Sequence, residues 1–383
     1  MVNNRSQPDL SPPPQLLVQL VAQSGVQFNG TNPWDIQIFD RSVYRRILSH
    51  GGLGFGETYM DGLWECDSMD EMVERLLRID SNGAISNWIK IRLLFDSLRF
   101  RLLNRQTHQH STQVIEQHYE AGIDLFSAML DSSMSYSCAY WQDADNLEQA
   151  QQAKLELICR KLELKAGETL LDIGCGWGGL LHYAATNYGV IATGVTLSPE
   201  QAAVARQRCS ELPVTIIVGD YRELSGSYDK IVSVGMFEHV GHKNYPHFFN
   251  LMHRLLHDEG LFLLHTIGYY TSGHNSDAWM DKYIFPGGQL PSAQQLTLPL
   301  DGLFLIEDWH NFGHDYARTL MAWWQNFHRA WPNQLQHHYS ERFYRMWRYY
   351  LMCSIGMFRS RQGHLWQLIL TKRERSKTYR SLR

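Results

Sequence analysis

The sequence predicts an α/β protein, with a parallel, doubly wound sheet in a C-terminal domain and a small, mainly helical domain before it. Two observations predict this architecture. From Val114 onward, short β-rich runs alternate with helical stretches, which is the pattern of a parallel sheet covered by helices. One of these runs, Thr169–Ile173, leads directly into a glycine-rich turn and a helix. A length of 383 residues accommodates two domains, which we place at 1–105 and 106–383.

Hydrophobic periodicity predicts the individual elements of the C-terminal domain. The expected strands are Thr169–Ile173, Val190–Val195, Val214–Val218, Lys230–Val234, Leu261–Thr266, Phe304–Asp308 and Leu365–Leu370. The expected helices are Leu147–Leu162, Pro199–Ser210 and Tyr245–Leu256, with a long aromatic helical region at Tyr316–Met352.

Two segments of the N-terminal domain have a recognisable pattern. The glycines from Gly51 to Gly56 are expected to form turns, because their spacing does not fit a dinucleotide-binding loop and no β-rich run precedes them. Trp88–Arg105 repeats apolar residues at helical spacing among basic ones, which predicts a basic amphipathic helix. Such a helix lies on an anionic membrane surface or packs between domains, and the sequence leaves both open.

Charge is unevenly distributed, although the net charge is only −4. Residues 342–383 hold eleven of the 35 Lys and Arg side chains but only one of the 39 acidic ones, Glu374. This asymmetry predicts either a basic face directed at something anionic or a solvated basic tail. We expect no nucleic-acid partner, because the net charge is negative and the sequence has no recognised reader motif.

The six cysteines are scattered without a CxxC pair, and the polar, Pro-rich N-terminus does not resemble a secretory signal. No apolar run approaches the ~18–20 residues that span a bilayer. We therefore expect a reduced, cytoplasmic protein without a metal site.

The glycine-rich turn Gly174–Gly179 predicts a site for a nucleotide-like cofactor. Glycine lets the backbone approach a ligand closely and adopt positive φ, and here Gly174 and Gly176 directly follow the strand. The later glycines are closer together than in a dinucleotide fingerprint, and Asp172 lies inside the motif. S-adenosylmethionine (SAM) fits this spacing better than NAD, which is the nearest competitor.

Polar side chains follow the next two predicted strands, and they support the same cofactor. Thr196 and Gln201 come at the end of the second strand, where side chains reach ribose hydroxyls. Asp220 and Tyr221 end the third strand, where an acid and an aromatic ring can pair with and stack on adenine.

The residues that suit chemistry lie around the fourth and fifth strands. Glu238 and His239 lie just past a strand end, on the side where the sulfonium of SAM is expected. His265 lies in an apolar run, and taken alone it is a typical core residue. The aromatic segment Tyr136–Trp141 precedes the α/β pattern and is expected to close over the cofactor, with Tyr136 and Ser137 at the cofactor.

Together these motifs resemble the cyclopropane-fatty-acyl-phospholipid synthases over nearly the whole chain. The matching segments are GETYMDGLWECD (56–67), YSCAYW (136–141), LDIGCGWGG (171–179), GVTLSPEQ (194–201), VSVGMFEHVGHKNY (232–245), FLLHTIG (262–268), KYIFPGG (282–288) and EDWHNFG (307–313). LDIGCG is shared with many methyltransferases, whereas YSCAYW, FEHVG, HTIG and DWHNFG in this order are much more specific.

The resemblance implies a Rossmann-like SAM-dependent methyltransferase domain behind a small N-terminal domain. It implies SAM as methylene donor, the cis double bond of an unsaturated acyl chain in a membrane phospholipid as acceptor, and bicarbonate as general base. It assigns the bicarbonate pocket to Cys138, Glu238, His265, the backbone of Ile267, and Tyr316. Beside these neighbours, His265 becomes a functional candidate rather than a core residue, and Cys138 a hydrogen-bond donor rather than a nucleophile.

Such an enzyme is expected to dock peripherally on membranes, because its substrate stays in the bilayer. Two other functions stay open: C-methylation of an acyl chain or soluble metabolite without ring closure, and SAM-binding membrane regulation without turnover. The sequence departs from the family pattern at Glu120 and Ile123, which puts the order of that loop in doubt. It does not decide acyl or head-group preference, the role of Gly268–Trp279, or whether the chain forms a homodimer.

Overall fold

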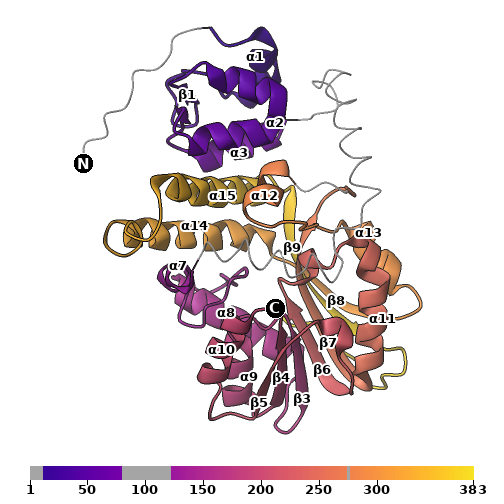
Figure 1. Cartoon of the computed structure of the whole chain (residues 1–383). Helices are drawn as coiled ribbons and strands as arrows, with labels where there is room; N and C mark the ends of the chain where they lie inside the picture. Colours follow the sequence, from indigo (N-terminus) through magenta and orange to yellow (C-terminus); the bar gives the residue numbers. More distant parts are fainter. Residues whose placement is uncertain (1–11, 80–121, 274–276) are drawn as a thin grey trace.

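The computed structural model describes residues 12–79, 122–273 and 277–383 of the chain. The predicted helix Trp88–Arg105, the residue Glu120 and the predicted domain boundary lie outside these residues. A small helical unit comes first, with helices α1 (Gln15–Val21), α2 (Ser42–Met60) and α3 (Met69–Leu77). Strands β1 (Gln37–Ile38) and β2 (Trp64–Glu65) pair antiparallel within it (Figure 1).

The prediction of turns at Gly51–Gly56 is wrong, because these glycines belong to helix α2. Only Gly51 leaves helical geometry, with φ 58° and ψ −134°, which kinks the helix. Gly56 allows close packing instead: a Cβ there would lie 2.5 Å from Cδ1 of Trp279. Gly56 therefore lets helix α2 pack closely on Trp279, a role that glycine content alone does not distinguish from turn formation.

The second unit is built on a seven-stranded sheet with the order β5-β4-β3-β6-β7-β9-β8. Its strands are β3 (Thr169–Ile173), β4 (Ile191–Thr196), β5 (Val214–Val218), β6 (Tyr228–Val234), β7 (Leu256–Tyr269), β8 (Leu305–Asn311) and β9 (Gly363–Thr371). Its helices are α7 (Ile123–Met129), α8 (Leu147–Lys161), α9 (Gly179–Tyr188), α10 (Pro199–Arg208), α11 (Tyr245–Leu255), α12 (Ala278–Tyr283), α13 (Ala293–Thr297), α14 (Gly313–Ala330) and α15 (Glu341–Arg359). The α/β class and every predicted strand are confirmed.

The expectation of an entirely parallel sheet is wrong at one strand. Strands β3 to β7 pair parallel, but β9 runs antiparallel to both β7 and β8. The predicted helical region at Tyr316–Met352 is two helices, α14 and α15, joined through a π-helical turn at Trp331–Leu335. Helices α14 and α15 pack side by side, so the chain returns to the end of the sheet where β8 ended. Strand β9 therefore starts from that end and runs antiparallel to β8.

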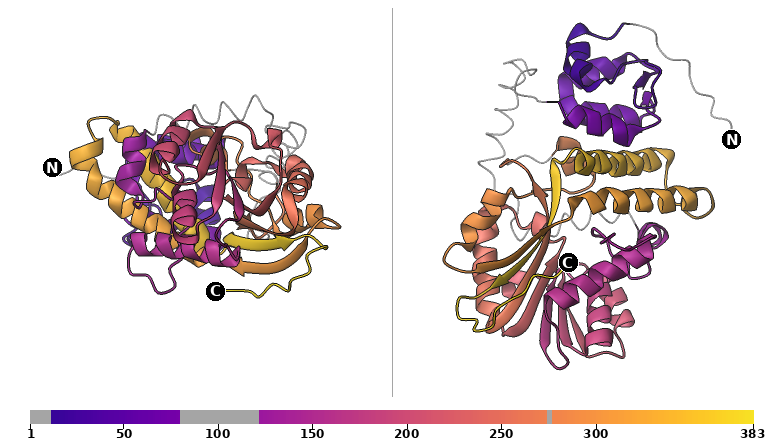
Figure 2. Two further views of the ribbon diagram at one scale, coloured as in Figure 1. Left: turned by 90° about the horizontal axis from the view of Figure 1, so that it is seen from below. Right: turned by 180° about the vertical axis from the view of Figure 1, so that it is seen from behind.

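Helices α14 and α15 lie between the N-terminal unit and the sheet (Figures 1 and 2). One apolar cluster runs through both units and includes Trp64, Trp279, Trp323 and Trp347. Two further clusters fill the faces of the sheet. The N-terminal unit therefore shares a hydrophobic core with the sheet domain across helix α15.

The basic segment 342–383 is not an unpaired basic face, because seven of its eleven cations are ion-paired within the protein. The paired cations are Arg342, Arg345, Arg348, Arg359, Lys372, Arg375 and Arg383. Four of them lie on α15 and reach acids of the N-terminal unit; Arg342 is 3.1 Å from Asp61, and Arg345 and Arg348 share Glu65. Much of the charge asymmetry thus serves to join the two units.

In residues 12–79, 122–273 and 277–383, none of the helices combines the length and the apolar character needed to cross a bilayer.

Candidate active site

A cavity of about 1430 Å³ opens at the carboxyl ends of the strands and extends to the N-terminal unit. It is lined by every residue that the sequence assigns to the cofactor: Tyr136, Ser137, Asp172, Gly174, Gly176, Thr196, Gln201, Asp220 and Tyr221. Three of the residues assigned to catalysis, Glu238, Ile267 and Tyr316, also line it. The structure therefore brings the two predicted groups of residues to one cavity.

The glycine turn between β3 and α9 forms one wall. Gly174 has φ 85°, and a Cβ there would lie 2.7 Å from Cβ of Met236, so only glycine fits. Gly176 has φ 53°, but a Cβ there would meet nothing within 4 Å. The backbone of this turn is therefore exposed to the cavity without side chains in front of it, as the close approach of a nucleotide-like ligand requires.

Asp172, at the end of β3, is buried, and its Oδ1 has no hydrogen-bond partner within the described part of the chain. Burial raises the pKa of this carboxyl to about 7, while the nearby Lys154 acts in the opposite direction. An unsatisfied buried carboxylate oxygen beside an open glycine turn matches the need of SAM for an acceptor at its ammonium group.

Lys154 of helix α8 was not anticipated from the sequence. Its side chain is buried, and Nζ donates to Oγ of Ser137 at 3.1 Å. Burial lowers its pKa to about 8, opposed by the acids Asp131 and Asp172. The burial of Lys154 could have been predicted from the helical periodicity. Lys154 lies one turn from Ala150 and from Ile158, which are both buried on the inner face of the predicted helix.

The second and third strand ends arrange their polar groups through local hydrogen bonds. Thr196 Oγ1 donates to Oε1 of Gln201 at 2.9 Å, and Ser198 caps helix α10 by accepting from the Gln201 N–H. Asp220, expected at adenine, accepts from Nε of Arg222 at 2.8 Å. The ring of Tyr221 packs edge-on against Phe248 at 5.6 Å.

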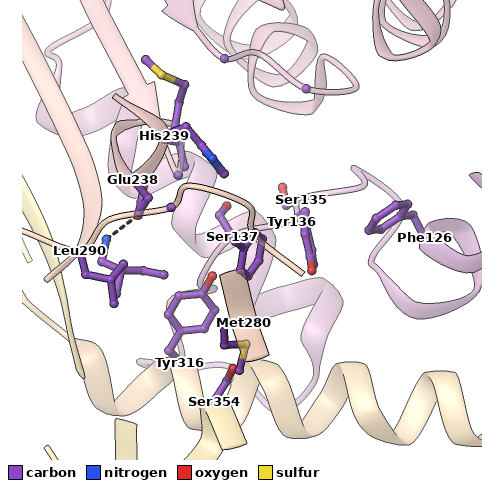
Figure 3. Close-up of a pocket in the computed structure, with 18 of the residues that line it drawn as sticks. Phe126, Ser135, Tyr136, Ser137, Glu238, His239, Met280, Leu290, Tyr316 and Ser354 are labelled. Carbon is purple, nitrogen blue, oxygen red and sulfur yellow. Dashed lines mark hydrogen bonds between the residues drawn. The ribbon is translucent and has the colours of Figure 1, made fainter. Parts of the chain in front are cut away.

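Glu238 lies where the cofactor wall meets the apolar part of the cavity. Its Oε1 accepts from the backbone N–H of Ile267 at 2.6 Å, while its Oε2 is buried and has no hydrogen-bond partner in residues 12–79, 122–273 and 277–383. Burial raises the pKa of this carboxyl, although the Ile267 bond lowers it. The hydroxyl of Tyr316 points toward the space that Glu238 and Ser137 also border (Figure 3).

Cys138 and His265 do not line the cavity but are buried behind it. Burial raises the pKa of the Cys138 thiol well above its usual value, and Sγ donates to the Ala139 carbonyl at 3.2 Å. Burial lowers the pKa of His265 well below its usual value, with Lys154 and Lys161 adding to the effect. Both side chains are thus neutral near pH 7.

Aromatic residues surround the region of the cavity between the glycine turn and the apolar lining. Tyr136 and Tyr350 are joined through their hydroxyls at 2.9 Å, and Tyr316 stacks on Phe358 at 4.6 Å. Tyr350 was missed by the sequence argument, because one tyrosine in a long aromatic helix does not indicate which cavity it borders.

The far part of the cavity is apolar. Its lining includes Phe55, Val73 and Leu76 of the N-terminal unit, together with Met280, Phe285, Tyr349, Met357 and Phe358. Ile123, one of the two departures from the family pattern, begins helix α7 and also borders the cavity.

The structure resembles that of the mycolic acid cyclopropane synthase CmaA1, which was solved in complex with SAH and CTAB. The TM-score is 0.63 at 33% sequence identity, and the match covers 68% of this chain and 98% of CmaA1. Fold and site together define a SAM-dependent enzyme of the methyltransferase type.

The family model for mycolic acid cyclopropane synthetase matches residues 106–368, and the chain belongs to this family. It is 50% identical over 357 residues to the cyclopropane-fatty-acyl-phospholipid synthase of Escherichia coli K12, covering 92% of each. It is also 37% identical to a probable fatty acid methyltransferase of Pseudomonas putida, covering 70% of this chain and 72% of the relative.

Proposed function

We propose that this enzyme is a cyclopropane-fatty-acyl-phospholipid synthase, which transfers a methylene group from SAM to the cis double bond of an acyl chain in a membrane phospholipid. The observation that carries the proposal is Glu238: a buried carboxyl with one unpartnered oxygen, at the junction of a cofactor wall and a large apolar cavity. An ordinary polar acceptor would not need the apolar part. The identity of 50% with the E. coli synthase supports the same activity.

The chemistry requires a base in an environment that excludes water. When an alkene takes up the methyl group, positive charge develops on the acyl chain, and a proton must leave the new methyl before the ring closes. The rings of Tyr136 and Tyr316 border the cavity, and in the proposed reaction they would stabilise that charge by about 0.5–2 kcal/mol per contact. The apolar lining keeps out water, which would otherwise trap the cation as an alcohol.

We propose that bicarbonate is the base, held by Cys138, Glu238, His265 and Tyr316, while the backbone at Ile267 orients Glu238. Two unpartnered buried atoms, Glu238 Oε2 and His265 Nε2, suit a small polar group. When bound, bicarbonate supplies a proton acceptor small enough to reach the acyl carbon. The Ile267 N–H already holds Oε1 of Glu238, so we assign Ile267 to orienting that carboxyl.

We further propose cytoplasmic, peripheral action at the membrane, with the boundary between a lipid-facing N-terminal domain and the catalytic domain at residues 105 and 106. The docking charge is expected from Trp88–Arg105, since most cations of residues 342–383 are engaged internally. Binding to anionic vesicles should fall as salt rises, by about 1 kcal/mol for each contacting cation that is screened. Sedimentation with vesicles at low and high salt tests this, and salt-independent binding would contradict it.

The proposed function is tested with vesicles of unsaturated phospholipid, SAM and bicarbonate-depleted buffer. We expect acyl chains heavier by one CH₂ that resist mild hydrogenation, S-adenosylhomocysteine release, and stimulation by added bicarbonate. A methylated chain without a ring would instead support C-methylation, the activity suggested by the P. putida relative's name. Lack of S-adenosylhomocysteine release with lipid present would favour a regulator.

A further inference from the structure

Three polar residues lie in register across neighbouring strands behind the active site. His265 of β7 pairs with Gln367 of β9, which pairs with His310 of β8. Cross-strand partners point to the same face of a sheet, so the three side chains are neighbours. Gln367 is fully buried, and its Nε2 lies 3.1 Å from Nδ1 of His265.

The charges around this row favour a neutral His265. Helix α8 contributes two buried lysines, Lys154 and Lys161, and both act against a protonated imidazole. Lys161 is itself held 3.2 Å from Asp308 Oδ2 and 3.1 Å from Nδ1 of His310. A neutral imidazole carries its single hydrogen on one of its two nitrogens, and the partner of the other nitrogen selects which one.

We propose that Gln367 is a positioning residue that selects the Nε2–H tautomer of His265. The Gln367 amide donates to Nδ1, which must then be the unprotonated nitrogen. The hydrogen therefore resides on Nε2, which is buried and has no hydrogen-bond partner among the residues that the structure describes. Nε2 of His265 is thus a hydrogen-bond donor, not an acceptor.

A donor at this position suits an anion. This step rests on the proposed function, in which bicarbonate binds beside Glu238. The carboxylate of Glu238 accepts hydrogen bonds, so the donors that an anion needs must come from uncharged groups such as His265. A glutamate at position 367 would accept from Nδ1–H and reverse the tautomer, or would stabilise the imidazolium. Glutamine is the residue of this shape that donates to Nδ1 without adding a negative charge.

The tautomer is measured directly, without turnover, by NMR of the full chain labelled with ¹⁵N-histidine. His265 is assigned by comparison with His265→Asn. We expect hydrogen on Nε2 in the unaltered protein, on Nδ1 or on both nitrogens in Gln367→Glu, and a mixture in Gln367→Met. Hydrogen on Nδ1 in the unaltered protein, or one tautomer in all three proteins, would overturn the inference.

Thr371→Val is the matched control, because Thr371 is buried on the same strand and its hydroxyl binds Glu307, away from His265. It should leave the His265 signals unchanged. If Gln367→Glu does not fold, Gln367→Met and the unaltered protein still decide the question.

A second measurement separates the inference from the proposed function. In vesicle assays, Gln367→Glu should raise the bicarbonate concentration for half-maximal rate by about 10- to 100-fold, with SAM affinity unchanged. An unchanged bicarbonate requirement would contradict the role of the tautomer in anion binding. If bicarbonate does not stimulate the unaltered enzyme at all, the proposed base is wrong, while the NMR result still decides the tautomer.

Discussion

The two parts of the cavity are built in different ways. The cofactor part is made largely of backbone and short polar side chains at the ends of β3, β4 and β5, within about fifty consecutive residues. The acceptor part is made of apolar and aromatic side chains from helices α2, α3, α12, α14 and α15, which are up to about 300 residues apart. On the proposed function, local structure would hold a ligand common to many enzymes, and tertiary packing would hold the particular acceptor. Glu238 stands at the border of the two.

Substitution of Glu238, where the two parts of the cavity meet, should have the largest effect on activity. Glu238→Gln removes the acceptor oxygen but keeps the shape, so turnover should fall by about 10²- to 10⁴-fold. SAM affinity, measured by calorimetry, should stay within about twofold, because Glu238 serves the chemistry and not the cofactor. Glu211→Gln, at an exposed position, is the control. Loss of SAM binding in Glu238→Gln would show that Glu238 contributes to the cofactor part, and the distinction between the two parts would fail at this residue.

The cofactor part can be broken through its backbone. Gly176→Ala and Gly62→Ala both place a Cβ at positive φ in open space, so each should destabilise the protein by roughly 1–2 kcal/mol. Only Gly176 faces the cavity, and only its variant should weaken SAM binding, by about tenfold or more. Denaturation and calorimetry on both variants check this. Equal SAM affinities would show that the glycine turn does not touch the cofactor.

The buried carboxyl of Asp172 should lower the stability of the ligand-free protein, although it is expected to bind SAM. The pKa of Asp172 is raised to about 7, so the folded state binds more protons than the unfolded chain between about pH 4 and 7. Stability from this group is therefore present below that window and lost as pH rises through it.

Asp172→Asn should stabilise the ligand-free protein, by up to roughly 4 kcal/mol at pH 8 and less at pH 5, partly offset by lost attraction to Lys154. Its SAM affinity should fall. Urea unfolding at both pH values tests this, with the exposed Asp301→Asn as control. A gain that is the same at both pH values would contradict the raised pKa.

The acceptor part should respond most mildly, because many apolar groups share its wall. Phe55 stacks on Trp64 at 4.2 Å and borders the cavity from the N-terminal unit. Phe55→Leu should raise the lipid concentration for half-maximal rate by about 2- to 10-fold and leave SAM affinity unchanged. Leu48→Ala, exposed on the same helix, should change neither. If SAM affinity falls in Phe55→Leu, the two parts are not independent.

The meeting of the residues assigned to the cofactor in one cavity could be predicted, because a strand, a tight turn and a strand end are local patterns. Gly174, Thr196 and Asp220 needed only their neighbours in sequence and the rule that ligands bind at the carboxyl ends of parallel strands. Glu238 was found by the same rule. His265 was harder: a histidine in an apolar run is ambiguous until its neighbours on other strands are known.

The residues that escaped prediction act through distant partners. Lys154 matters because helix α8 turns it toward Ser137 and Asp172, and Gln367 because β9 inserts between β7 and β8. The arginines of α15 appeared to be a basic surface, because their acidic partners lie about 280 residues away. Charge counts along a chain do not reveal which charges meet.

By itself, the sequence determined the α/β class, the dependence on SAM and the position of each strand of the seven-stranded sheet, because these depend on periodicity and on short-range backbone geometry. Only the tertiary structure decided the direction of β9, the pairing of the basic segment, the helical role of Gly51–Gly56 and the way His265 is held. Each of these depends on contacts between segments far apart in the chain. Such contacts are set by burial and close packing of the whole molecule rather than by any local pattern.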